Sequence, residues 1–406
     1  MTRVSTVPTL STAQRVLLAL LALALFVLNT WGVYALFTSR VQIAVWDLHI
    51  PWLALRAMLR DGADPYSDEV TRATEWQMLG RLARPDELRL ALAYPLHVMV
   101  LIGPLTLLPL PVAQALWFSL LEAGLLAFII VAPHAVGWRP PTWLLALTAF
   151  FVLGLYPNVW AMILGQVSIV VATLIALAWW GLRTGRWGLA GACLALATIK
   201  PQMTFLFVPG VLAWAVCRRR WRLVTTFVVA FGALILLPFP WLPTWPLAWL
   251  AALDSYVGYT IYEPPLVMLT RSTWLAGVIA VLLLVWTVYR WWHAEPRGAA
   301  LDWALGVLVV VSALIAPRTT HVNQLMLLLP LFFIFTRLPG GGIIAAVEIV
   351  LLAGLWLVDL VLLPPVTNSL QHMTWQHRLI SPILPFGLIL VLLYFSPGRR
   401  GEAPDA

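Results

Sequence analysis

A short polar segment directly after the first apolar run contains carboxylates that could act as a base. The segment VWDLHIPWLALRAMLRDGADPY, residues 45–66, contains Asp47, Asp61 and Asp64 in a chain with only 17 acidic residues. A carboxylate held near a membrane surface is partly desolvated, which raises its basicity and suits it to deprotonate a hydroxyl group. Aspartate is also a favoured N-cap residue, so Asp47 could instead cap the helix that follows it. The residue alone leaves both interpretations open.

Two further segments could supply positive charge to a phosphate. Lys200 is the only lysine in the chain and lies inside a long apolar run, where Pro201 breaks the helix around it. Such a lysine must reach the membrane surface, pair with a carboxylate or phosphate, or line a cavity. The segment APRTTHVNQLMLLLP, residues 316–330, places Arg318 and His321 at the end of a transmembrane hairpin. Cations there suit an anion such as phosphate, although a short polar turn explains the same residues.

Other polar and aromatic residues lie where apolar segments end. GADPY, residues 62–66, is a turn by composition. An amide between two apolar runs can bind substrate or join two helices by a hydrogen bond, and a tyrosine at a segment boundary is often only an interfacial anchor. The possible substrate-binding residues of this kind are His49, Asp64, Tyr66, Tyr94, Gln166 and Arg271.

The composition also excludes several classes of site. The histidines are scattered, without a pair at helical i, i+4 spacing beside a carboxylate, so we expect no metal. Neither a P-loop nor a dinucleotide glycine motif is present, so we expect no cofactor of that kind. The net charge of +8 comes from arginines at the ends of apolar segments, which is not the basic face of a nucleic-acid-binding protein.

The elements that must position these residues are membrane helices. Apolar residues make up 62% of the chain and charged residues only 10%, which excludes an ordinary soluble domain. A bilayer crossing needs about 20 apolar residues, so we expect an all-α polytopic membrane protein with about 11–13 transmembrane helices. The expected segments are 14–37, 92–109, 112–132, 143–157, 160–182, 188–216, 223–240, 273–290, 301–316, 323–336, 342–363 and 380–396.

Basic residues predict which loops face the cytoplasm. The CRRRWR run, residues 217–222, and the tail 399–406 are expected inside, and the first helix is a signal anchor. Residues 38–90 then form the first exported loop, with two amphipathic helices along the membrane surface, and residues 238–272 form the second. A strict count of crossings places Arg183 and Arg186 outside, whereas a re-entrant segment and a broken hairpin would place them inside.

The order of several short motifs resembles that of a known enzyme family. The motifs are G-x-D-P-Y at 62–66, Y-P at 94–95, G-Q at 165–166, the basic pair Arg183 and Arg186, A-G at 190–191 and K-P at 200–201. Together they resemble glycosyltransferase family 87, the polyprenyl-phosphate-mannose-dependent α-mannosyltransferases of the C-type glycosyltransferase superfamily. The resemblance covers residues 30–222 and resumes at 316–330. Family members often have a serine-proline and an aromatic-histidine pair there, where this sequence has APRTTHVNQ.

The resemblance implies one integral membrane glycosyltransferase domain over residues 1–398. Such an enzyme takes a sugar, mannose by default, from a polyprenyl-phosphate donor to a lipid or glycan acceptor on the outer face of the cell membrane, with inversion. The position that matches the family's catalytic carboxylate is Asp47. Because a phosphate leaves without protonation, one base suffices, and Lys200, Arg318 and His321 can hold the phosphate. A transporter or lipid-linked sugar flippase is the alternative, but no two related halves are evident.

Overall fold

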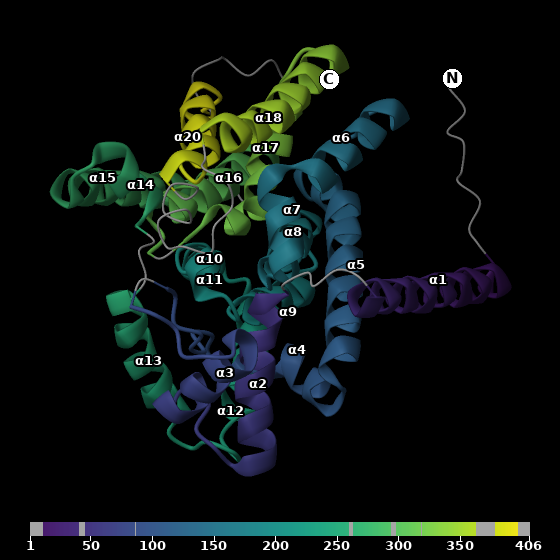
Figure 1. Cartoon of the computed structure of the whole chain (residues 1–406). Helices are drawn as coiled ribbons and strands as arrows, with labels where there is room; N and C mark the ends of the chain where they lie inside the picture. The colour runs from purple at the N-terminus through teal and green to yellow at the C-terminus, as the bar shows by residue number, and fades with distance from the viewer. Residues whose placement is uncertain are drawn as a thin grey trace.

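The regular structure of the chain is entirely helical in the part that the computed structural model describes. The described residues are 11–39, 45–85, 87–259, 263–293, 298–317, 319–362 and 378–396. Helices surround a buried apolar core, and α1 extends away from the body (Figure 1). Helices satisfy their backbone hydrogen bonds internally, as an apolar chain in lipid requires. The predicted all-α polytopic class is confirmed.

The helices alternate between long spans and short pieces. In chain order they are α1 (Thr12–Ser39), α2 (Trp46–Asp61), α3 (Asp68–Leu79), η1 (Leu96–Val98), α4 (Met99–Ile102), η2 (Gly103–Leu107), α5 (Leu110–Val136), α6 (Thr142–Gly154), α7 (Tyr156–Leu164), α8 (Ser168–Thr184), α9 (Trp187–Ala197), α10 (Pro201–Thr204), α11 (Phe207–Cys217), α12 (Trp221–Leu236), α13 (Trp245–Tyr259), α14 (Pro265–Thr270), α15 (Thr273–Trp292), α16 (Gly298–Ile315), η3 (His321–Leu327), α17 (Leu328–Phe335), α18 (Gly341–Leu362) and α20 (Ile383–Tyr394).

Fewer helices reach bilayer length than the apolar segments suggested. Five described helices are long and apolar enough to cross a membrane, namely α1, α5, α15, α16 and α18, and the pair α6 and α7, bent by 53°, adds a sixth if it is one span. Most of the other apolar segments form helices of 10–17 residues. Proline and short polar breaks divide them: the expected run 188–216 is interrupted where Lys200 precedes Pro201. The protein is a multi-pass membrane protein.

Residues 92–109 do not form the expected crossing, because they fold into short helical pieces, and α5 begins directly after them, where α1 crosses it (Figure 1). Phe37, near the end of α1, lies edge-on to Phe118 in the first part of α5, with ring centroids 5.6 Å apart. About two helix turns earlier in α1, Asn29 donates to Glu122 further along α5 (2.6 Å). These two contacts hold α1 across the first half of α5. The short helices between residues 96 and 107 span about 18 Å as an α-helix, less than a bilayer core of about 30 Å.

Arg183 and Arg186 lie at the same end of the body as the basic run 217–222. Arg183 forms an ion pair with Asp302 of α16 and donates to the last carbonyl of α5 (3.1 Å). Arg186 precedes α9, and the guanidinium of Arg220 lies 4.6 Å from the ring centre of Trp187, the first residue of that helix. The α7–α8 and α9–α10 junctions are at the opposite ends of these helices. The packing therefore agrees with the re-entrant alternative and not with the strict count.

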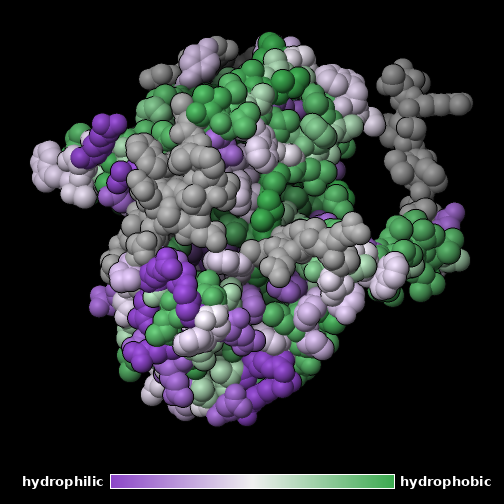
Figure 2. All heavy atoms as spheres, in the orientation of Figure 1, coloured by the Kyte–Doolittle hydropathy of each residue, from purple (hydrophilic) through white to green (hydrophobic). Residues whose placement is uncertain are grey.

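Hydrophilic residues are concentrated on one part of the surface. Figure 2 shows them over the region of α2 and α3, while much of the remaining described surface in that view is hydrophobic. Helix α2 buries Leu48, Trp52 and Leu55 at helical spacing and exposes its polar side. The two helices expected along the membrane surface are therefore present, each with one buried face.

Candidate active site

The turn between α7 and α8 is fixed by a glycine and a buried tryptophan. Gly165 ends α7 in the left-handed conformation (φ 72°), which glycine adopts without steric cost. Trp117 of α5 donates its indole N–H to the carbonyl of Gly165 (2.8 Å). A Cβ atom at residue 165 would overlap the side chain of Val45, directly before α2. Position 165 therefore requires glycine, and the start of α2 packs against the turn.

This packing joins three residues that are far apart in the sequence. Asp47 lies in the first turn of α2, and its carboxylate accepts a hydrogen bond from Nε2 of Gln166. Oε1 of Gln166 accepts a hydrogen bond from Nζ of Lys200. Lys200 is 3% exposed, Gln166 is buried and Asp47 is partly buried. The structure thus places the two predicted charged residues on either side of one amide.

Asp47 does not cap its helix. The N-cap position of α2 is Val45, and no side chain caps it. Burial raises the pKa of Asp47 from 3.8 to about 6, against the opposing effects of the Lys200 charge and the hydrogen bond from Gln166. Burial also lowers the pKa of His49 to about 4, so its imidazole is neutral near pH 7. Asp47 is therefore ionised at neutral pH, and it is more basic than an ordinary aspartate.

The G-x-D-P-Y turn, residues 62–66, fixes the backbone of Tyr94 near Asp47. Asp64 Oδ1 accepts a hydrogen bond from the backbone N–H of Tyr66 (2.9 Å), which closes the turn. The Tyr66 hydroxyl donates to the carbonyl of Tyr94 (2.8 Å). Burial and the nearby charge of Asp47 raise the pKa of Tyr94 well above its ordinary value. Asp64 and Tyr66 thus fix the backbone at Tyr94, which is close enough to Asp47 to respond to its charge.

Of the two other residues predicted to hold the phosphate, only His321 is within the described part of the chain. His321 begins η3, is buried, and lies 5.5 Å from Tyr156 between ring centroids. Ser168, two residues after Gln166, donates to the backbone of η3 at Val322 (2.7 Å), so this segment lies against the same turn. Arg318 falls outside the described residues.

Arg271 is separate from this group. It is an exposed residue between α14 and α15, in the left-handed region with φ 52°. Within the described residues, no contact joins it to Asp47, Gln166 or Lys200. Arg271 therefore gains no support as a substrate-binding residue.

The comparison with protein families decides the class of the protein. The model of glycosyltransferase family 87 matches residues 92–317, more than half of the chain. The chain belongs to glycosyltransferase family 87. It is therefore a membrane glycosyltransferase, and the resemblance in its motifs is confirmed. The match includes Gln166 and Lys200, begins after Asp47 and ends before His321. Neither a curated protein nor a solved structure matches the chain.

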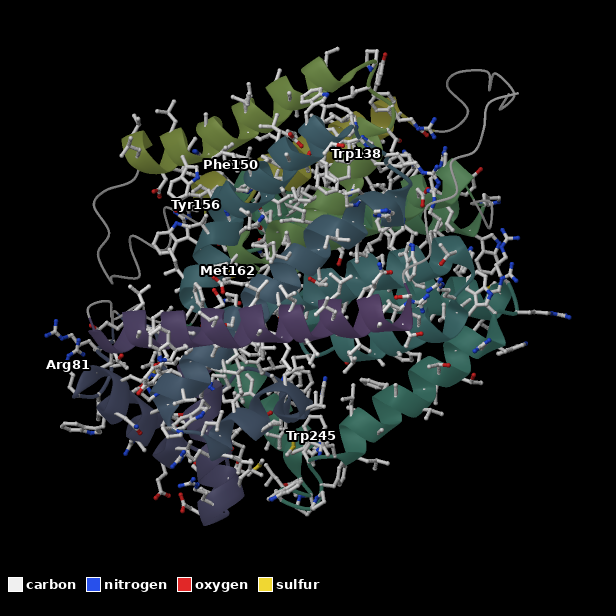
Figure 3. The ribbon with its side chains drawn as sticks, turned by 90° about the vertical axis from the view of Figure 1, so that its right-hand side faces the viewer. Arg81, Trp138, Phe150, Tyr156, Met162 and Trp245 are labelled. Atoms are coloured by element: carbon white, nitrogen blue, oxygen red, sulfur yellow. The ribbon has the colours of Figure 1, made fainter. Side chains whose placement is uncertain are left out.

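Some residues that shape the candidate site were not apparent from the sequence. Trp117 and Val45 hold the Gly165 turn, but an apolar residue in an apolar segment is indistinguishable from its neighbours. Tyr156 donates its hydroxyl to Asp359 of α18 (2.7 Å), which ties the start of α7 to a helix 200 residues later. Tyr156 and Met162 of α7 lie on the same side of the molecule as Arg81, after α3 (Figure 3). The only sequence indication of this arrangement was the G-Q pair itself.

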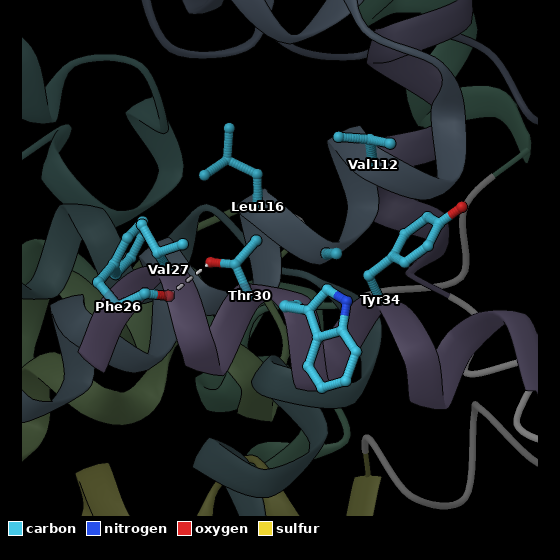
Figure 4. Close-up of a pocket in the computed structure, with 8 residues that line it drawn as sticks. Phe26, Val27, Thr30, Tyr34, Val112 and Leu116 are labelled. Atoms are coloured by element: carbon cyan, nitrogen blue, oxygen red, sulfur yellow. Dashed lines mark hydrogen bonds between the residues drawn. The ribbon is translucent and has the colours of Figure 1, made fainter. Parts of the chain in front are cut away.

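An apolar groove of the glycosyltransferase lies apart from the charged residues. It separates α1 from the start of α5 and has a volume of ≈ 350 Å³ (Figure 4). Its lining is Phe26, Val27, Thr30, Trp31, Tyr34, Val112, Ala115 and Leu116. It contains no charged side chain and none of the predicted site residues. In the described part of the chain, no three His, Cys, Asp or Glu side chains form a group that could hold a metal ion.

Proposed function

We propose that this glycosyltransferase transfers a hexose, mannose by default, from a polyprenyl-phosphate donor to a hydroxyl group of a lipid or glycan acceptor. The observation that carries the proposal is the pairing of one buried ammonium with one basic carboxylate across a single amide. A carboxylate can take the proton of an attacking hydroxyl, and an ammonium can stabilise a departing phosphate. These are the two groups that a phosphate-linked donor requires.

The reaction follows from these two roles. Asp47 takes the proton of the acceptor hydroxyl while its oxygen attacks C1 of the donor sugar. The bond from C1 to the phosphate oxygen breaks, and its electron pair leaves with the prenyl phosphate. Attack opposite to the leaving group inverts the configuration at C1. Lys200 stabilises the charge on the phosphate, with His321 and Arg318 proposed as further phosphate ligands.

The distribution of charge supports a site on the extracytoplasmic face of the cell membrane. Asp47, Gln166 and Lys200 lie at the ends of α7, α8 and α9 that are opposite to the arginines. Arginine-rich ends face the cytoplasm in most membrane proteins, so the opposite end is exported. We accordingly propose that residues 38–90 and 238–272 are external. Transporters commonly hold their substrates near the membrane midplane between two related halves, so this arrangement favours the transferase.

The test is sugar transfer from polyprenyl-phosphate-mannose to an extract of membrane lipids by the purified protein. We expect the wild type to form a labelled product, and Asp47→Asn to lose this activity while it still binds the donor. Asp68→Asn is the matched control, because Asp68 is an exposed acid in the same loop. No transfer by the wild type from mannosyl or other prenyl-phosphate donors would refute the proposed activity. Equal transfer by Asp47→Asn would refute the assignment of the base alone.

A further inference from the structure

The amide of Gln166 has its hydrogen-bonding atoms engaged by two charged residues. Nε2 donates to the Asp47 carboxylate and Oε1 accepts from the Lys200 ammonium. An ionised carboxylate only accepts and an ammonium only donates, so the amide fits between them in one orientation. The two charges therefore fix which way the amide points, although each of its two atoms keeps one further hydrogen-bonding site.

The backbone of Gln166 is fixed independently of any substrate. Its N–H donates to the carbonyl of Ala161 (2.9 Å), which continues the turn at Gly165. Trp117 holds the carbonyl of Gly165 from the other side (2.8 Å), and Val45 packs on the glycine. The amide is therefore supported by α5, α7 and the start of α2 before a ligand arrives.

Separation of the two charges has a chemical consequence. A buried carboxylate and ammonium attract each other strongly and would otherwise form a direct ion pair. In a direct pair the carboxylate would be a weaker base, and the ammonium would be less available to a phosphate. One amide between them gives each charged group a hydrogen bond and leaves its other hydrogen-bonding positions available to a substrate. The groups that act on Asp47 are Lys200 and Gln166, and its charge acts on Tyr94; His49, two residues later in α2, is neutral.

From these contacts we infer that Gln166 is a positioning residue, which holds the Asp47 base and the Lys200 ammonium apart and in fixed orientation. The inference rests on the proposed transfer from a phosphate-linked donor. It predicts that a change at residue 166 alters the basicity of Asp47, seen in the pH profile, as well as the affinity for the donor, whereas a residue that only binds the donor sugar would alter the donor KM and leave the pH profile unchanged.

The experiment compares Gln166→Glu and Gln166→Met with Thr173→Val, using the pH profile of kcat/KM. Thr173 is a buried residue of α8 that hydrogen-bonds within its helix and to α5, away from Asp47. In Gln166→Glu, the added negative charge should move the acid limb to higher pH and raise the donor KM about tenfold, since the glutamate neutralises Lys200. Gln166→Met has similar volume but makes neither hydrogen bond. Its volume should keep the two charges apart, so loss of the hydrogen bond from Nε2 should raise the pKa of Asp47 and move the acid limb to higher pH by less than Gln166→Glu does.

Each outcome decides the inference. If the Gln166 variants lose kcat but keep the wild-type pH profile, Gln166 has only a structural role. The wild-type pH profile is the result expected for Thr173→Val. A rise in the donor KM with the wild-type pH profile would assign Gln166 to the donor sugar. If the wild type transfers no sugar, the proposed function fails by itself, and thermal unfolding measured against pH replaces the kinetic profile. The unfolding transition of Gln166→Glu should then respond to Asp47 at higher pH than that of the wild type, and an unchanged response would overturn the inference.

Discussion

Two acid–base pairs, each with one buried side chain, lie at opposite ends of α8 and are built differently. At the C-terminal end, Asp302 forms a direct ion pair with Arg183 and also accepts a hydrogen bond from Trp179 (2.9 Å). At the N-terminal end, Gln166 separates Asp47 from Lys200. The direct pair satisfies its charges internally and joins α5, α8 and α16. In the separated pair neither charge is matched by direct contact with the other, so we expect the direct pair to be structural and propose a chemical role for the separated one.

The largest expected effect is on the activity of the separated pair. Asp47→Asn removes the base and keeps the shape, so kcat should fall by about 10²- to 10⁴-fold. The unfolding temperature should not fall, because the neutral amide is easier to bury than the carboxylate. Transfer kinetics and thermal unfolding of the same sample measure both quantities. A variant that unfolds earlier and retains its kcat would place Asp47 in the structural class.

The direct pair should show the opposite pattern. Arg183→Met removes the cation beside the buried Asp302; because the Arg183 side chain is 34% exposed, the free energy of unfolding should fall by about 1–2 kcal/mol, less than for a fully buried pair. The kcat of the folded fraction should remain that of the wild type. Adding Asp302→Asn to Arg183→Met should recover part of the lost stability, because no uncompensated charge is then left. Loss of kcat without loss of stability would contradict the structural assignment of this pair.

A smaller effect is expected from the glycine that supports the separated pair. Gly165→Ala introduces a Cβ that overlaps Val45 at a left-handed residue, so Asp47 should move relative to Gln166. We expect kcat to fall about tenfold, as geometry some distance from the chemistry is disturbed. Gly232→Ala in α12 is the control, since a Cβ there meets nothing within 4 Å. If both variants keep full activity, the Gly165 turn does not position the base.

The two pairs also differ in how far the sequence reveals them. A lone lysine in an apolar run and an aspartate after the first helix are costly in a membrane, so Asp47 and Lys200 could be selected by residue type. The partnership of Arg183 with Asp302 joins residues 119 positions apart and has no local pattern. The bridge through Gln166 likewise depends on how α2 packs on the Gly165 turn. The sequence therefore indicated which residues could take part in chemistry, but it did not indicate which of them would be in contact.

The same limit applies to the fold. Helical, membrane-embedded segments follow directly from apolar composition, and the amphipathic pattern located α2 and α3 in the loop. The path of residues 92–109 did not follow, because a crossing helix and short helices packed beside α2 have the same composition. Trp52 shows what decides it: its indole donates to the carbonyl of Leu105 (2.9 Å) and holds that segment on α2.

The smallest expected effect is the pH dependence that the separated pair gives to stability. The pKa of Asp47 is about 6 in the folded protein and 3.8 for an ordinary aspartate, so between these values the folded state binds more protons than the unfolded state. This group therefore lowers the free energy of unfolding as the pH rises from about 4 to about 6, and adds no further change above that. The unfolding temperature of the wild type, relative to Asp47→Asn, should fall by a few degrees across this window and then stay constant. A difference that changes in the opposite direction, or only above pH 7, would show that burial does not set the basicity of Asp47.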